Sequence, residues 1–325
     1  MRADRALEAR ILLAGSPGGH DPAALWRDAG SEERAAAARV ADDLELRGVR
    51  ALLRGEAGYP PALLDLSDAP RVVFVRGTVP TRERAVAIVG SRAASPYGIA
   101  QAGRLAADLA RLGYAVVSGL ARGIDGAAHR GALEAGGASL AVLPGGLDEV
   151  TPRHHEALAE ALCARGGLLS ERASGPPPYR ATFVERNRLI AALAAATVVV
   201  EAAARSGALS TAAAARRLRR PVLAVPGDVD RETSRGTHGL IRAGAALCES
   251  AGDVLRALAA AEPRGAPAAP ADRLREALGS APRTVDDLAR AAGLDVAATL
   301  ALLLELEWAG LAAAAPGQRW RRAAP

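Results

Sequence analysis

Hydrophobic and polar positions alternate in blocks through the middle of the chain, and residues 85–89 begin the clearest block. This short apolar run is typical of a buried parallel strand. A helix follows, with Ser95 suited to the N-cap and Pro96 to the first helical position. Its apolar face is predicted to hold Ala102, Leu105, Leu109 and Leu112. A second apolar run at 114–117 completes a strand–helix–strand unit.

The same alternation continues on both sides of this unit. Further apolar runs predict strands at 72–75, 138–143, 168–171, 197–200 and 221–225. Strands that alternate with helices form a doubly wound α/β sheet, so we expect a Rossmann-like core over residues 56–261. Residues 1–55 show helical periodicity at 6–14 and 32–48 and predict a small helical region. A helix at 236–244 is expected to close the core near Leu258.

The C-terminal part of the chain reads as a separate domain. Residues 262–270 are rich in proline and alanine and predict a linker. Within 271–325, three helical patterns precede a candidate hairpin at 310–322, an order typical of a winged-helix domain. Both a nucleic-acid contact and a protein-contact or structural role remain open for it.

The net charge and the type of basic residue indicate how the chain can bind a negatively charged partner. The chain has 325 residues, a net charge of +5, and no lysine among its 41 basic residues, so every phosphate contact must use a planar guanidinium. Cys163 and Cys248 match no disulfide or zinc spacing. No apolar run reaches membrane-spanning length and no signal sequence is evident, so we expect a cytoplasmic protein without membrane association.

Small residues and arginines follow several of the predicted strands. These residues are Gly90, Ser91 and Arg92; Ser118, Gly119 and Arg122; and, after a later strand, Ser206 and Gly207. Ligands of doubly wound folds bind beyond the carboxyl ends of the strands, where backbone N–H groups and a guanidinium form an anion site. The common dinucleotide and P-loop fingerprints are absent. The alternative is that the glycines only permit tight turns.

Phe183 is conspicuous in a chain with 3% aromatic residues, because Arg180, Arg186 and Arg188 flank it. Single-strand binding needs a basic groove and a ring on which a base can stack. The alternative for Phe183 is a position in the hydrophobic core. Asn187 is the only asparagine of the chain, which favours a position where an amide bonds on both sides.

Taken together, these stretches resemble the DNA-processing protein A (DprA, or Smf) family over about residues 59–250. The matching segments are IVGSR at 88–92, SGLARGID at 118–125 with Ala128-His129, FVERNR at 183–188, VE at 200–201, SGALST at 206–211 and VPG at 225–227. The resemblance implies a homodimeric, Rossmann-like protein that binds single-stranded DNA, protects incoming strands in natural transformation and loads RecA. It also implies a sterile-alpha-motif-like region at 1–55 and a winged helix at 271–325.

The resemblance and the strand ends together predict one set of DNA-binding residues. They are Gly90, Ser91, Arg92, Ser118, Gly119, Arg122, Arg153, Arg180, Phe183, Arg186, Asn187, Ser206 and Gly207. The chain departs from the family pattern at Arg153 and Arg180, where relatives often carry lysine, and at Val184, which replaces a common proline.

An enzyme is the alternative class of function. Residues 144–149, PGGLDE, are similar to a motif of the lysine-decarboxylase-like phosphoribohydrolases, but lack its third glycine and its threonine. Asp125 and His129 are spaced for a base pair or a metal site. We expect instead that Asp125 caps its helix and His129 packs beside a loop. With no nucleophile–base arrangement, the sequence predicts a protein that is not an enzyme and has no metal or cofactor.

Overall fold

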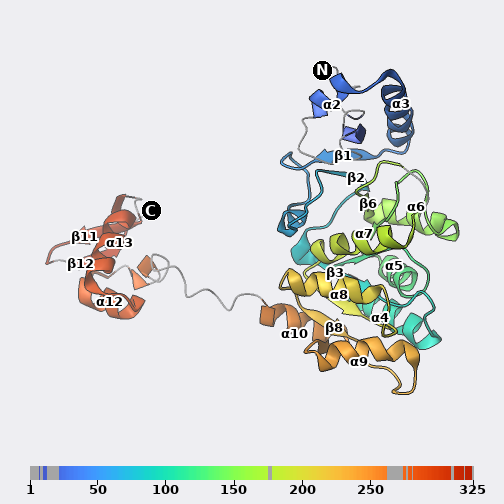
Figure 1. The fold of residues 1–325 in the computed structure, drawn as a ribbon. Coiled ribbons are helices and arrows are strands. Elements are labelled where there is room, and N and C mark those ends of the chain that lie inside the picture. Colours follow the sequence, from blue (N-terminus) through green and yellow to red (C-terminus); the bar gives the residue numbers. More distant parts are fainter. Residues whose placement is uncertain are drawn as a thin grey trace. The chain divides into compact units, whose positions relative to one another are not determined.

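The computed structural model describes residues 7, 10–12, 22–174, 178–261, 274–275, 277–279, 281–308, 311–317 and 319–323. The chain separates into two compact units, Met1–Ala261 and Glu262–Pro325. The elements of both units are labelled in Figure 1. Each unit has its own hydrophobic core. No described helix has the length and apolar character needed to cross a bilayer.

The first unit is built on a nine-stranded sheet. Across the sheet the strands are β1 (Arg50–Leu53), β2 (Val72–Gly77), β6 (Gly167–Ser170), β5 (Ser139–Val142), β4 (Ala115–Ser118), β3 (Ala85–Val89), β7 (Ala196–Val199), β8 (Val222–Ala224) and β9 (Ala246–Leu247). Strand β2 runs antiparallel to β1 and β6, and the other neighbours are parallel. The predicted α/β class is confirmed.

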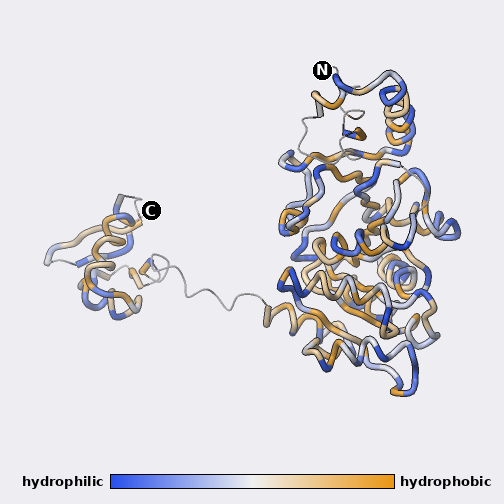
Figure 2. Tube along the Cα trace, in the orientation of Figure 1, coloured by the Kyte–Doolittle hydropathy of each residue, from blue (hydrophilic) through white to orange (hydrophobic). Residues whose placement is uncertain are grey.

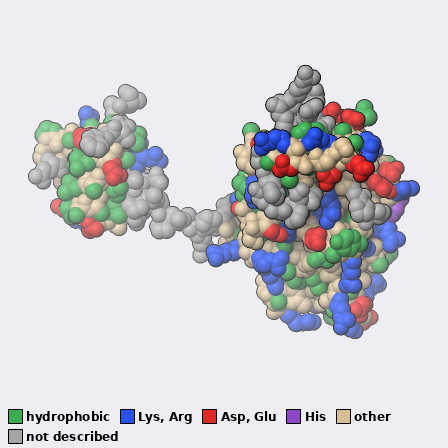
Figure 3. Space-filling model, turned by 45° about the horizontal axis from the view of Figure 1, so that its top comes forward, with side chains coloured by type: hydrophobic (Ala, Val, Ile, Leu, Met, Phe, Trp, Pro, Cys, Tyr) green, Lys and Arg blue, Asp and Glu red, His purple; other side chains and the backbone are tan. Residues whose placement is uncertain are grey.

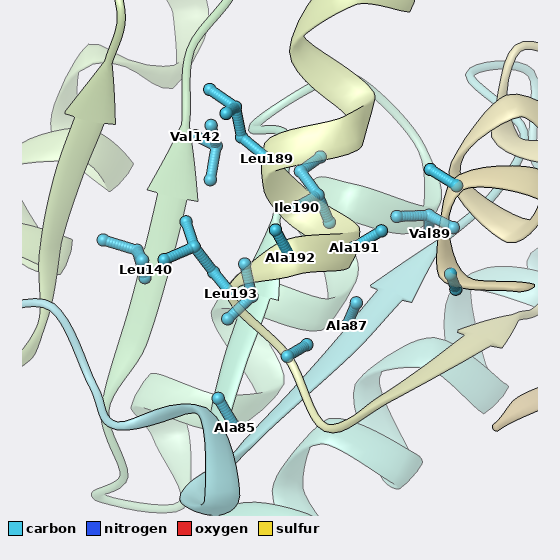
Figure 4. Close-up of a cluster of buried hydrophobic side chains, with 14 of the residues drawn as sticks. Ala85, Ala87, Val89, Leu140, Val142, Leu189, Ile190, Ala191, Ala192 and Leu193 are labelled. Carbon is cyan, nitrogen blue, oxygen red and sulfur yellow. The ribbon is translucent and has the colours of Figure 1, made fainter. Parts of the chain in front are cut away.

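Helices cover both faces of the sheet because alternate residues of each strand point to opposite sides. On β3, Val86 and Ile88 pack with α4 (Pro96–Arg111), α5 (Ile124–Glu134) and α10 (Ala251–Ala261). Ala85, Ala87 and Val89 pack on the opposite face with α7 (Arg180–Ala192) and α8 (Ala208–Arg217), as Figure 4 shows for α7. Apolar residues accordingly concentrate in the strands and inner helix faces (Figure 2). Helices α6 (Glu156–Arg165) and α9 (Arg235–Arg242) also belong to this unit.

The predicted start of α4 is confirmed, and its predicted apolar face is confirmed except at one end. Ser95 is the N-cap, and its Oγ accepts the Gly98 N–H at 3.1 Å. Ala102, Leu105 and Leu109 are buried, but Leu112 follows the last helical residue and is exposed.

Two regions differ from the sequence prediction. The N-terminal stretch contains α2 (Pro22–Asp28) and α3 (Ser31–Leu46), but it also supplies β1, which pairs with β2. Most of the helix predicted near residues 6–14 lies outside the described residues. The helix predicted at 236–244 is confirmed as α9, but the core continues beyond it with β9 and α10, which were not predicted. Gly244 has a φ of +87°, which ends α9 and turns the chain into β9.

The second unit has the predicted winged-helix layout. Its described elements are β10 (Arg283–Thr284), α12 (Val285–Ala292), α13 (Val296–Trp308), β11 (Ala312–Ala315) and β12 (Arg319–Arg322), with strand order β10-β12-β11. Thr284 caps α12 by accepting the Asp287 N–H at 3.2 Å. The predicted linker at 262–270 lies outside the described residues, as does most of the first of the three predicted helical patterns, residues 272–278.

Helices α4 and α5 approach so closely that glycine is required between them. A Cβ built on Gly131 would lie 2.2 Å from the Gly103 carbonyl oxygen, which is backbone and cannot swing aside. This contact brings α5, and the loop that precedes it, against the β3–α4 segment.

Gly131→Ala should therefore destabilise the protein, by about 1–3 kcal/mol, because the two helices must move apart. Gly239→Ala is the matched control, since nothing lies within 4 Å of a Cβ built there. Its expected effect is a small stabilisation of about 0.5–1 kcal/mol from improved helix propensity. Chemical denaturation measures both, and equal free energies of unfolding for the two variants would contradict the assignment.

Candidate nucleic-acid interface

A cleft opens where the connections of the sheet diverge. The chain leaves β3 toward β4 on one side, whereas β7 lies on the other side of β3, and ligands of such folds bind at this switch point. The cleft has a volume of about 1070 Å³. Its lining includes Gly90, Ser91 and Arg92 after β3, Arg180, Phe183, Arg186 and Asn187 on α7, and Ser206 and Gly207 before α8.

The other four predicted residues do not line this cleft. The Ser118 hydroxyl donates to the Ile88 carbonyl at 2.6 Å and ties β4 to β3. A Cβ on Gly119 would lie 2.4 Å from Nη2 of Arg186, so glycine there makes room for the guanidinium. Arg122 is exposed, and Arg153 is exposed and pairs with Glu149 at 2.9 Å.

The loop after β3 is held from beneath by Glu201, at the end of β7. Its carboxylate accepts the Ser95 hydroxyl at 2.6 Å and the Ser95 N–H at 2.9 Å. A Cβ on Gly98 would lie 2.5 Å from Glu201 Oε2, so the first turn of α4 rests directly on this carboxylate. The start of α4 is thereby fixed beside Gly90, Ser91 and Arg92. Sequence reasoning quoted Glu201 only as part of a motif and missed this role.

Arg92 and Phe183 form one structural pair. The Arg92 Cζ lies 4.2 Å from the centre of the Phe183 ring, a cation–π contact. Phe183 is only half-buried and lines the cleft, so it is not a core aromatic. A guanidinium can stack on a ring and still present its N–H groups to a phosphate. The pair therefore places a cation and a ring in the same part of the cleft.

Arg186 serves the framework of the cleft. It is 5% exposed, and its guanidinium donates to the carbonyls of Gly119, at 3.0 Å, and Val142, which follow β4 and end β5. Burial lowers its pKa to about 10, opposed by the nearby charge of Asp125. Burial in turn raises the pKa of the Asp125 carboxyl. With its N–H groups given to carbonyls, this arginine braces the strand ends.

Asn187 connects α7 to the start of α8. Its Oδ1 accepts from Arg186 Nε at 3.2 Å, while Nδ2 donates to the Gly207 carbonyl at 3.1 Å and to the Ser210 hydroxyl at 2.8 Å. The expectation of an amide bonded on both sides is confirmed.

Three exposed arginines supply the positive charge of the cleft. Arg92, Arg180 and Arg205 line it, and none of them forms an ion pair or hydrogen bond with a described residue. Sequence reasoning missed Arg205, although it directly precedes the predicted Ser206 and Gly207. The two carboxylates among the described lining residues are Asp125 and Glu232, so the lining carries an excess of positive charge.

Asp125 and His129 do not form a catalytic pair. Asp125 accepts the N–H groups of Gly119 at 3.2 Å and Ala121 at 3.4 Å, so it caps the loop before its helix and not the helix itself. His129 is buried, with Nδ1 2.7 Å from the Ser139 hydroxyl. Burial lowers the pKa of His129 to about 3. Among the described residues, no group of three or more His, Cys, Asp or Glu is placed to hold a metal ion.

Removing the Arg186 side chain should destabilise the folded protein, in addition to any effect on ligand binding. Arg186→Met leaves Asp125 buried without its cation, so we expect a loss of about 3 kcal/mol in the free energy of unfolding. Arg180→Ala is the matched control and should change that free energy by less than about 0.5 kcal/mol, because its side chain is exposed. Urea titration measures the free energy of unfolding of both variants. A value for Arg186→Met equal to that of the parent would refute the bracing role.

The buried imidazole should make stability depend on pH. His129 stays neutral in the folded chain down to a pKa of about 3, whereas in the unfolded chain it takes up a proton below about pH 6.5. The folded state therefore loses stability as the pH falls from 6.5 toward 3, by at most about 1.4 kcal/mol per pH unit. His129→Gln should give a shallower slope of unfolding free energy against pH in this window. Equal slopes of unfolding free energy against pH for the parent and His129→Gln would show that His129 does not cause the pH dependence.

Comparison with known proteins places this site in a family. The family model described as DNA recombination-mediator protein A matches residues 50–259, and the DprA winged helix domain matches residues 250–318. A putative DNA processing protein DprA of Mycobacterium tuberculosis is 44% identical over 87% of this chain and 80% of its own length. Protein Smf of Escherichia coli K12 is 42% identical over 82% of this chain and 76% of its own.

Two solved structures share the fold. DprA from Streptococcus pneumoniae superposes with a TM-score of 0.63 at 33% identity, over 75% of this chain and 84% of that one. DNA processing protein A from Helicobacter pylori, whose structure concerns its single-stranded DNA binding mode, gives 0.57 at 28% identity, over 65% and 96%. The switch-point cleft with its braced strand ends and the C-terminal winged helix thus belong to a member of the DNA recombination-mediator protein A family, also called DprA or Smf.

Proposed function

We propose that this chain binds single-stranded DNA in the switch-point cleft, without reading its sequence, and acts in DNA uptake and recombination. The observation that carries the proposal is the Arg92–Phe183 pair, 4.2 Å apart within the cleft. Single-strand binding requires cations for the phosphates and a ring for the bases, and this pair offers both. A paired base in a duplex cannot reach such a ring, so the cleft favours unpaired strands.

The family supports the proposal and extends it. The Helicobacter pylori relative is described by its single-stranded DNA binding mode, and the matching family model is named for recombination mediation. By this relationship we propose that the chain protects incoming strands in natural transformation, loads RecA onto them, and works in the cytoplasm as a homodimer.

The enzyme alternative is less consistent with the cleft. Residues 144–149, which are similar to a phosphoribohydrolase motif, do not line it. Glu149, the candidate acid of that motif, is exposed and paired with Arg153. The described lining contains no histidine, and the Asp125 carboxylate is engaged with loop N–H groups. A binding role accounts for these residues and a hydrolytic role does not.

Arg92 and Phe183 should contribute to DNA affinity through different interactions, and the dependence of affinity on salt concentration distinguishes the two. Arg92→Ala should flatten the plot of log K against log salt by about 0.7, the value for one phosphate contact on a single strand. Arg153→Ala is the matched control, because this exposed arginine lies outside the cleft, and its slope should equal that of the parent. Fluorescence anisotropy with an oligothymidylate provides the measurement.

Phe183→Leu should weaken binding by about 1–3 kcal/mol with an almost unchanged slope, because stacking depends little on salt. Thermal unfolding must first show that each variant is folded. The proposal is abandoned if the parent binds duplex and single strands equally, or if Arg92→Ala and Arg153→Ala behave alike.

A further inference from the structure

Tyr179, the N-cap of α7, is an aromatic residue whose side chain has no hydrogen-bond or ring partner among the described residues. Its side chain is 61% exposed, and no described residue forms a hydrogen bond with its hydroxyl. The other described tyrosines are all engaged: Tyr59 is buried and bonds the Pro70 carbonyl, Tyr97 bonds the Pro226 carbonyl, and Tyr114 packs under Arg84. The face of the Tyr179 ring is therefore free to stack on a base without loss of a structural contact.

The backbone of Tyr179 is nevertheless held firmly. Its carbonyl oxygen accepts both the N–H of Thr182, at 3.0 Å, and the Thr182 hydroxyl, at 2.7 Å. Thr182 itself is 3% exposed, so the anchor is part of the core. An aromatic side chain on an anchored backbone has few torsions left to order when a ligand arrives.

Tyr179 is the N-cap of α7 and directly precedes a row of α7 side chains that line the cleft, although it does not line the cleft itself. Phe183, Arg186 and Ile190 follow it at helical spacing, and all three face the cleft. Tyr179 precedes Phe183 by four residues, about 6 Å along the helix axis. Arg180, which is exposed and unpaired among the described residues, lies between the two rings in sequence and lines the cleft.

We infer that Tyr179 is a second base-stacking position, at the lip of the cleft, on which the strand continues after leaving Phe183. This inference rests on the proposed function. Phe183 receives one base inside the cleft, Arg180 holds a phosphate of the intervening backbone, and Tyr179 receives a base outside it. The strand therefore runs along the N-terminal end of α7, and the protein covers more nucleotides than the cleft alone can hold.

The inference makes the effect of Tyr179 depend on ligand length. A short strand fills only the cleft, so it does not contact the outer ring. A longer strand reaches both rings, and loss of the outer one removes one stacking contact, worth about a 5- to 100-fold change in affinity. Because stacking involves no ion release, the slope of log K against log salt stays the same.

The test compares the full-length parent, Tyr179→Ala and Tyr179→Phe on oligothymidylates of about four and about sixteen nucleotides. On the long strand, Tyr179→Ala should bind at least about 5-fold more weakly than the parent, with an unchanged salt slope. On the short strand the two should agree within about twofold. Tyr179→Phe keeps the ring and should match the parent on both strands.

Each other result overturns a defined part of this account. If the parent binds neither strand, the proposed function itself fails. If the parent binds and Tyr179→Ala equals it on the long strand, only the second stacking position is wrong. An equal loss on both strands would place Tyr179 in the framework of the cleft, and a loss with Tyr179→Phe would assign the effect to the hydroxyl, so either outcome rejects the inference.

Discussion

The buried guanidinium of Arg186 is the interaction on which the cleft depends. It bonds carbonyls of Gly119 and Val142, which belong to the ends of two neighbouring strands, and it passes a further bond to Asn187. Asn187 then holds the loop before α8. A planar guanidinium presents five donors in a fixed fork and can bond several carbonyls at set angles, whereas a lysine has three donors on one nitrogen. These bonds give partners to backbone carbonyls at the strand ends and hold the strand ends together below the cleft.

A second brace, formed by Glu201, acts on the opposite side of the switch point. Its carboxylate fixes the start of α4, next to the loop with Arg92, and Arg186 fixes the end of the neighbouring strand β4. Buried charges are costly unless they are bonded, and here each is bonded to the backbone. The exposed arginines can therefore meet a ligand from a site that is already organised.

The second unit presents a different surface. Helix α13 occupies the place of the recognition helix in winged-helix domains, yet its sequence contains no arginine, and Val296, Leu300 and Leu304 on it are exposed. Strand β12 instead carries three arginines, Arg319, Arg321 and Arg322 (hydrophobic and charged side chains are coloured in Figure 3). Phosphate contact requires cations, so α13 is unsuited to reading DNA, whereas the hairpin is compatible with it.

The sequence by itself determined the alternation of strands and helices, the Ser95 cap and the loops where a ligand would bind, because these depend on residues within a few positions of one another. It could not separate Arg186 from Arg92. Both are arginines in motifs beside small or aromatic residues, but Arg186 is buried by carbonyls 67 and 44 positions away, while Arg92 lies exposed on Phe183. The division of arginines between framework and cleft and the brace by Glu201 follow from contacts between distant segments, which only the tertiary structure decided.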